Sequence, residues 1–178
     1  EWAMVYYDEN SVIFLHDAPE NKEAIERFKI DFNRRKIENP GEALSIAGFF
    51  EKIGEIKSAE EVYIKLLEVN PRFLEAGNSL AFIYINSKRF YDALNVIDRF
   101  LQYYPKAAGL YCNKGAAYLR MGRKEEGISM LEKSASLNPY LRQASYMLGL
   151  VYFKEGDTEK ATRQFIKYLA LDPYSADG

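Results

Sequence analysis

One stretch of the sequence, GLYCNKGAAYLRMG at residues 109–122, gathers residue types that could do chemistry. It holds Cys112, the single cysteine of the chain, with Lys114 two residues later and three glycines around them. A thiolate activated by a nearby base is a nucleophile, and a glycine-rich loop can hold phosphate with its backbone N–H groups. Either chemistry depends on the structural element that carries these residues.

His16 and Asp17 form a second candidate, because a histidine beside a carboxylate has the residue types of a proton-transfer pair. A lone His-Asp at the end of a strand is more often plain surface, so no catalytic role is expected for it. No other part of the sequence suggests a reactive cluster. We therefore expect no catalytic residue, no cofactor and no metal ion.

The composition points to an ordinary globular chain. The 178 residues are 48% hydrophobic and 28% charged, with a net charge of −2, which does not favour binding to nucleic acid or to an anionic membrane surface. The longest apolar run, LAFIYI at residues 80–85, is far shorter than the roughly 20 residues of a membrane helix. The chain opens on Glu1 rather than Met, so we interpret it as a piece of a longer protein. Its localisation is left open; it is a water-exposed domain that could belong to a membrane protein.

A period of 34 residues organises most of the chain. Prolines 71, 105, 139 and 173 stand 34 residues apart, which predicts four stacked units at 40–73, 74–107, 108–141 and 142–175. Each unit has two stretches of about 14 residues with helical apolar spacing, divided by a turn. The turn column contains Gly54, Lys88, Gly122 and Gly156. The pattern therefore predicts an all-α array of helical hairpins.

Small residues recur where the two helices of a hairpin should touch. Gly115 and Gly149 on the first helices are expected to face Gly127 and Ala161 on the second helices, so that two backbones can approach closely. The columns resemble the tetratricopeptide repeat, whose pattern is W-x2-L-G-x2-Y, then A-x3-F, then P. The fourth unit carries the pattern as Ser145, Leu148, Gly149, Tyr152, Ala161, Phe165 and Pro173. The third unit departs from it at Lys114, where leucine is usual.

This resemblance implies a right-handed superhelix whose first helices line the concave side, and a non-catalytic role in protein–protein interaction. It also explains the opening stretch, which becomes the first helix of the third unit. Gly115 is then a helix-contact residue and Gly122 the turn, while the strand and the G-x-x-x-x-G-K-[ST] pattern of a phosphate-binding loop are missing. Lys114 points away from Cys112, so we expect the cysteine to act as a small apolar residue.

The inner face of the first helices is predicted to be the binding site for a peptide or partner protein. Its expected lining is Asn78, Phe82, Ile85, Cys112, Asn113, Leu119, Tyr146, Leu150 and Phe153. The alternative is that these residues pack against each other or against the N-terminal segment. A role in capturing acidic chaperone tails is not expected, since the clamp positions hold Leu44 and Gly48, or Asn78 and Phe82 one unit later, and Asn113 alone makes no clamp.

The first 39 residues differ from the repeats, so we divide the chain into 1–39 and 40–178. Aromatic and β-branched residues predict two strands, Trp2–Tyr7 and Val12–Leu15, followed by a helix from about Glu20. The apolar stripe of that helix is Ala24, Ile25, Phe28 and Phe32. The segment WAMVYYDENSVIFLHDAPEN also resembles the stretch after the last membrane helix of bacterial multi-spanning glycosyltransferase-like proteins. A second possible function is therefore the repeat-containing tail of such a protein, positioning a partner or an acceptor.

The C-terminal end of the array presents an unfinished edge. Tyr168, Leu169 and Leu171 lie where the first helix of a further unit would dock, and repeat arrays usually close with a polar capping helix. We expect another copy of the chain, or sequence outside this chain, to cover this edge. A third possible function is therefore a self-assembling scaffold.

Overall fold

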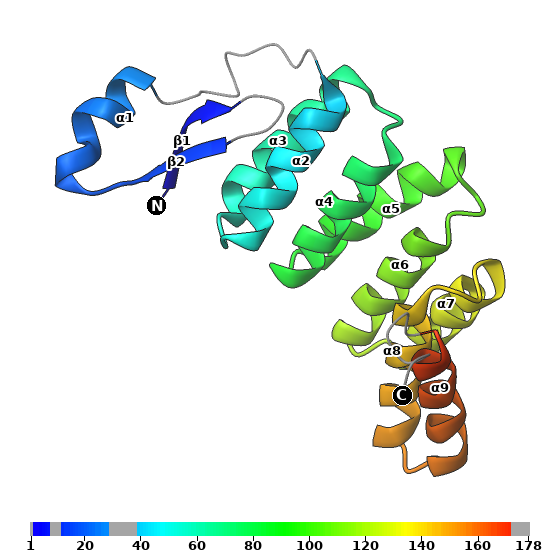
Figure 1. Cartoon of the computed structure of the whole chain (residues 1–178). Coiled ribbons are helices and arrows are strands. Elements are labelled where there is room, and N and C mark those ends of the chain that lie inside the picture. Colours follow the sequence, from blue (N-terminus) through cyan, green and yellow to red (C-terminus); the bar gives the residue numbers. More distant parts are fainter. Residues whose placement is uncertain (1, 8–11, 29–38, 172–178) are drawn as a thin grey trace. The chain divides into compact units, whose positions relative to one another are not determined.

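The computed structural model describes residues 2–7, 12–28 and 39–171 of the chain. It separates the chain into two compact units, residues 1–76 and 77–178. Helices follow one another in pairs along the chain, after a small pair of strands (Figure 1). This confirms the predicted all-α fold with an N-terminal hairpin. The division at residue 40, which separates the N-terminal segment from the repeats, stays a prediction.

The first unit begins with the predicted hairpin. Strand β1 (Trp2–Tyr7) pairs antiparallel with β2 (Val12–His16), with an irregularity in register between Met4 and Tyr6. The turn η1 (Pro19–Asn21) leads into helix α1 (Lys22–Phe28), which contacts β1. A two-stranded hairpin is marginal alone in water, so this contact gives it a surface on which to pack. Phe32, predicted to continue the apolar stripe, lies outside the described residues.

Helices α2 (Pro40–Lys52) and α3 (Ile56–Val69) form the first helical hairpin. Asn39 starts α2, because its side-chain oxygen accepts hydrogen bonds from the backbone N–H groups of Gly41 and Glu42 at 3.0 and 3.2 Å, and Pro40 follows at the first helical position. The two helices bury one face each against the other. The buried side chains are Ala43, Ile46, Ala47, Phe50, Ala59, Val62, Tyr63, Leu66 and Leu67.

Helix α4 (Leu74–Asn86) crosses the boundary between the units, and the second unit continues with further helices. These are α5 (Phe90–Tyr103), α6 (Ala108–Arg120), α7 (Lys124–Leu137), α8 (Arg142–Lys154) and α9 (Thr158–Ala170) (Figure 1). From α5 onward, each helix contacts the next one along the chain. Large apolar side chains with almost no exposed surface fill the layers: Ile83, Ile85, Ile97, Phe100, Leu110, Leu131 and Leu148.

The turn column behaves as predicted. Gly54, Gly122 and Gly156 have φ values of 82°, 79° and 79°, and Lys88 takes the same left-handed conformation with a φ of 61°. A left-handed residue after a helix reverses the chain and lets its last carbonyl groups accept hydrogen bonds. Lysine keeps this conformation at a steric cost that glycine avoids.

The small residues let neighbouring helices approach closely. A Cβ atom at Gly115 would lie 2.7 Å from Cγ of Leu131 and 3.0 Å from the carbonyl oxygen of Gly127. A Cβ atom at Gly149 would lie 2.6 Å from the ring of Phe165. Real side chains essentially never approach so closely, so these positions require glycine. The predicted contact between α6 and α7 through their glycines is confirmed.

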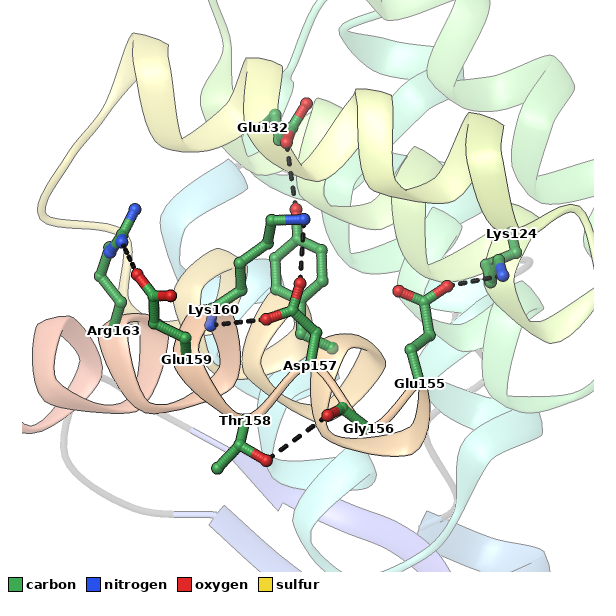
Figure 2. A network of polar contacts seen from close by, with 10 residues as sticks. Lys124, Glu132, Glu155, Gly156, Asp157, Thr158, Glu159, Lys160 and Arg163 are labelled. Carbon is green, nitrogen blue, oxygen red and sulfur yellow. Dashed lines mark hydrogen bonds and ion pairs between the residues drawn. The ribbon is translucent and has the colours of Figure 1, made fainter.

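Polar contacts join successive hairpins of the second unit. Lys114 Nζ on α6 lies 2.5 Å from Asp98 Oδ1 on α5, and Lys124 Nζ on α7 lies 2.6 Å from Glu155 Oε1 after α8. Figure 2 shows the second of these pairs beside the turn that leads into α9. At that turn Asp157 caps α9, since its carboxylate accepts a hydrogen bond of 3.0 Å from the backbone N–H of Lys160.

Candidate partner-binding groove

Cys112 lies in the interior of α6 with 7% of its surface exposed. Burial raises the pKa of its thiol from 9.0 to about 11, so the thiol keeps its proton at neutral pH and is a poor nucleophile. Lys114 forms its ion pair with Asp98 on the neighbouring helix. This geometry agrees with the prediction that the cysteine serves as a small apolar residue.

His16 and Asp17 are both exposed at the end of β2. The backbone carbonyl of His16 accepts hydrogen bonds from Asn21 Nδ2 at 2.9 Å and from the backbone N–H of Ala18 at 2.8 Å. These bonds shape the turn into α1 and use no side-chain atom of the pair. Within the described ranges, no group of three or more His, Cys, Asp and Glu side chains is placed to hold a metal ion.

The second unit has a hollow between helices α4, α6 and the start of α8. Its volume is about 360 Å³, and Phe82, Asn113, Ala116 and Met147 are among its walls. Phe82 is 48% exposed, which is high for a phenylalanine. An open apolar ring beside amide groups is a surface on which a peptide side chain can pack.

A second hollow adjoins the first at the far end of α6. Its volume is about 560 Å³, and its walls are Leu119, Arg120, Lys124, Met147, Leu150, Val151, Lys154 and Glu155. Arg120 and Met147 line both hollows, so the two hollows are direct neighbours. We call the two hollows together the groove.

Two amide side chains define the polar part of the groove. Asn113 Nδ2 on α6 donates hydrogen bonds to the backbone carbonyl of Asn78 at 3.2 Å and to Asn78 Oδ1 at 3.0 Å on α4. The bonds join the second hairpin to the third and fix both side chains. Gly109 faces Asn78, because a Cβ atom there would lie 3.4 Å from Asn78 Oδ1. The amides therefore have fixed orientations before any partner binds.

The structure brings most of the predicted binding residues to the groove. The predicted residues that line it are Asn78, Phe82, Ile85, Cys112, Asn113, Leu119 and Leu150. Ile85 and Cys112 are 1% and 7% exposed, so they support its floor and offer almost no surface to a partner. The accessible contact area comes from residues such as Phe82 and Leu150, which is 36% exposed.

Tyr146 and Phe153 lie apart from the lining of the two hollows. The ring of Tyr146 packs against the rings of Tyr168 and Phe165 on α9, with centroid distances of 5.2 and 6.3 Å. Tyr146 therefore turns toward the C-terminal helix rather than into the groove, although 43% of it is exposed. Phe153 is 66% exposed at the end of α8.

The predicted C-terminal edge is only partly open. Leu169 is 55% exposed, whereas Tyr168 and Leu171 are half-buried, and the guanidinium of Arg142 lies 4.5 Å from the centre of the Tyr168 ring. Ile166, which the sequence did not single out, is 61% exposed one turn before Leu169. The open apolar surface of α9 is thus formed by Ile166 and Leu169.

The basic residues of the groove were not predicted from the sequence. Arg120 and Lys154 end helices α6 and α8 and stand 34 residues apart, in the same column as Lys52 and Asn86. Arg120 Nη1 donates a hydrogen bond to Asn86 Oδ1 at 2.8 Å, so neighbouring members of this column touch. The 34-residue period carries this signal too, but the apolar columns that predict the lining do not include it.

Comparison with known protein families agrees with this architecture. Residues 108–140 and 143–175 match the family model described as tetratricopeptide repeat. These ranges cover α6 to α9, of which α6 and α8 contribute most to the lining of the groove. Among the described residues, all helices fall short of the length and apolarity needed to cross a membrane.

Two curated proteins share a part of their sequence with this chain. The Hsp70-Hsp90 organizing protein of Triticum aestivum is 27% identical over 99 residues, which are 56% of this chain and 16% of that protein. The protein O-mannosyl-transferase TMTC3 of Homo sapiens is 28% identical over 111 residues, which are 62% of this chain and 12% of that protein. The chain thus spans about one sixth or less of the length of these relatives.

Solved structures have the same fold. The thermophilic TPR protein TTC0263 of Thermus thermophilus is similar with a TM-score of 0.68 and 23% identity, over 75% of each chain. MamA from Desulfovibrio magneticus RS-1 is similar with a TM-score of 0.63 and 22% identity, over 90% of this chain and 89% of that one. At these identities the likeness is one of fold.

Proposed function

The chain carries tetratricopeptide repeats, and from that premise we propose that the groove of its second unit binds a segment of a partner protein. Such repeats are typically non-catalytic modules of protein–protein interaction. The observation that carries the proposal is the open ring of Phe82, 48% exposed beside the fixed amides of Asn78 and Asn113. Apolar surface with a few oriented polar groups suits an extended peptide or an amphipathic helix.

The test removes the exposed apolar side chains of both hollows. The double variant Phe82→Ala with Leu150→Ala should weaken partner binding strongly, since buried anchors contribute about 1–3 kcal/mol each to an interface. The matched control is Tyr91→Ala with Tyr140→Ala, which removes two aromatic side chains that are 73% and 79% exposed and do not line the groove.

The three chains are immobilised in parallel and exposed to a lysate of the source cells, and retained proteins are identified by mass spectrometry. The proposal expects a partner that wild type and control retain and the groove variant loses, with circular dichroism unchanged. Equal retention by all three chains would show that the partner binds elsewhere.

A second candidate function is the non-catalytic repeat part of a membrane glycosyltransferase-like protein. The similarity to the O-mannosyl-transferase TMTC3 supports it, and the aligned 111 residues necessarily include part of the repeats. In this role the groove would position a partner or an acceptor. The sequence upstream of Glu1 in the gene tests the idea, since several apolar segments of about 20 residues are required there. Their absence would remove this candidate.

A third candidate is a scaffold that assembles from copies of the chain. The open side chains of Ile166 and Leu169 on α9 support it, because the end of a repeat array presents apolar surface that a further unit would cover. Solution mass as a function of concentration is the test.

A further inference from the structure

The charged residues of the groove are unequal in sign. The second hollow is lined by three cations, Arg120, Lys124 and Lys154, and by one carboxylate, Glu155. Lys124 Nζ lies 2.6 Å from Glu155 Oε1, so these two charges offset each other. Arg120 and Lys154 have no ion pair with a carboxylate in the part of the chain that the structure describes. The groove is therefore locally positive in a chain whose net charge is −2.

The first hollow adds no negative charge. Its polar lining consists of Asn78, Ser79, Asn113 and Gln143, with Arg120 as its one charged member among the described residues. From Phe82 at one end to Lys154 at the other, the surface passes from apolar and amide groups to cations. A partner that matches this surface carries apolar side chains followed by carboxylates.

Arg120 is held in position for such a contact. Its Nη1 donates to the backbone carbonyl of Ile85 at 3.1 Å and to Asn86 Oδ1 at 2.8 Å. Both acceptors are neutral, so the charge of the guanidinium is not neutralised, and its other nitrogens can still donate. A guanidinium fixed on one side is suited to hydrogen-bond a carboxylate with the other.

A cation at the end of a helix also interacts favourably with the helix dipole. That effect explains a basic residue at the last position of α6 and of α8. It does not explain why the lining of the adjoining hollow contains no carboxylate for either of them, since its one carboxylate, Glu155, pairs with Lys124.

We propose that the groove takes an acidic segment of a partner protein, with apolar side chains against Phe82 and Met147 and aspartate or glutamate at Arg120 and Lys154. The inference rests on the proposed function and specifies its partner class. The positions that bind the carboxylates are the ends of the first helices of the third and fourth repeats, beside the turns.

The test selects ligands from a display library of random peptides about twelve residues long, at about 50 and about 500 mM NaCl. The full chain is compared with Arg120→Gln/Lys154→Gln, with Phe82→Ala/Leu150→Ala, and with the control Lys133→Gln/Lys167→Gln. The control removes the same charge from exposed lysines that do not line the groove. Sequencing gives the net charge of each recovered pool, and fluorescence anisotropy gives the affinity of one labelled peptide.

We expect wild type and control to recover peptides enriched in Asp and Glu at low salt, and less so at high salt. Loss of Arg120 and Lys154 should remove this enrichment and weaken the labelled peptide about three- to ten-fold, as expected for rim charges. Recovery of neutral or basic peptides that bind through Phe82 and Leu150 would overturn the acidic specificity, while the proposal that the groove is the binding site would remain. Recovery that is independent of Phe82 and Leu150, or no recovery, would overturn both proposals.

Discussion

The hydroxyl of Tyr152 on α8 donates a hydrogen bond of 3.2 Å to Glu132 Oε1 on α7, which joins the fourth repeat to the third (Figure 2). Burial raises the pKa of this phenol, and the neighbouring carboxylate raises it further. The bond lies at a seam between two hairpins, so its loss should loosen the contact between repeats.

Tyr152→Phe should therefore lower the free energy of unfolding by about 0.5–1.5 kcal/mol, because it removes one hydrogen bond and leaves the ring in place. Urea denaturation followed by circular dichroism measures the change. Tyr140→Phe is the control, since Tyr140 is 79% exposed. If both variants lose the same stability, the seam bond contributes nothing measurable.

Gly115→Ala should destabilise the chain by about 1–3 kcal/mol, because its methyl group would overlap Leu131 and crowd the backbone of α7. Gly48→Ala is the matched control. Gly48 also lies within a helix, α2, but a Cβ atom there meets nothing within 4 Å, so alanine should stabilise by about 0.5–1 kcal/mol. Thermal unfolding of both variants gives the sign, and two destabilised variants would contradict the packing argument.

Lys88→Gly should stabilise the chain by about 0.5–1 kcal/mol. Its φ of 61° is costly for lysine, and the relief exceeds the extra entropy of glycine in the unfolded chain. Ser87→Gly serves as a control, because Ser87 is not among the residues with positive φ and gains no such relief. Urea denaturation separates the two, and a Lys88→Gly chain no more stable than wild type would show that the turn carries little strain.

Alkaline pH should destabilise the chain partly through Cys112. The pKa of its thiol is 9.0 unperturbed and about 11 when buried, so between these values the unfolded chain loses a proton that the folded chain keeps. The unfolded state then binds fewer protons, and the free energy of unfolding falls as pH rises through this window. The complete loss is about 3 kcal/mol, because each of the two pKa units is worth about 1.4 kcal/mol.

Denaturation midpoints at pH 8 to 11 test this against Cys112→Ala, which lacks the thiol. The difference in the free energy of unfolding between the two chains should be largest at pH 8 and should shrink above pH 9. A difference that stays constant throughout would mean that Cys112 ionises equally in both states.

The open surface of α9 predicts self-association. Ile166→Lys with Leu169→Glu should reduce any growth of solution mass with concentration, because charged side chains are costly to bury in an apolar contact. Multi-angle light scattering measures the mass. Tyr91→Lys with Tyr140→Glu introduces the same charges on exposed rings away from α9 and should leave the mass curve unchanged. A wild-type chain that stays monomeric at every concentration would remove the scaffold function.

The repeat fold was predictable because its sequence pattern recurs in each of the four repeats. The period of 34 residues located the hairpins, and the turn column located the turns, including the one at Lys88, whose residue type alone gives no such indication. The contact between Gly115 and Gly127 followed from two columns of small residues. In each case the same physical requirement recurs in every repeat, so the pattern stays visible even where one repeat departs from it.

The groove was harder to predict. Column positions show which face of a helix a residue occupies, but not how far neighbouring helices cover it. Ile85 and Cys112 therefore belong to the predicted face and yet lie beneath its surface, while Tyr146 turns toward Tyr168 through an aromatic contact that has no column. The basic pair Arg120 and Lys154 was overlooked because a charged residue at a helix end looks like ordinary surface.

The polar contacts at the seams make the order of the repeats part of the fold. Lys114 of the third repeat meets Asp98 of the second, whereas Lys124 of the third meets Glu155 of the fourth. In the fourth repeat the residues 34 positions after the two lysines are Leu148 and Thr158, which carry no charge. A copy of the fourth repeat placed after the second would therefore face Asp98 with a leucine. Although their columns align, these repeats are not interchangeable modules. A duplicated or reordered array would lose the ion pairs between its repeats before it lost its apolar core.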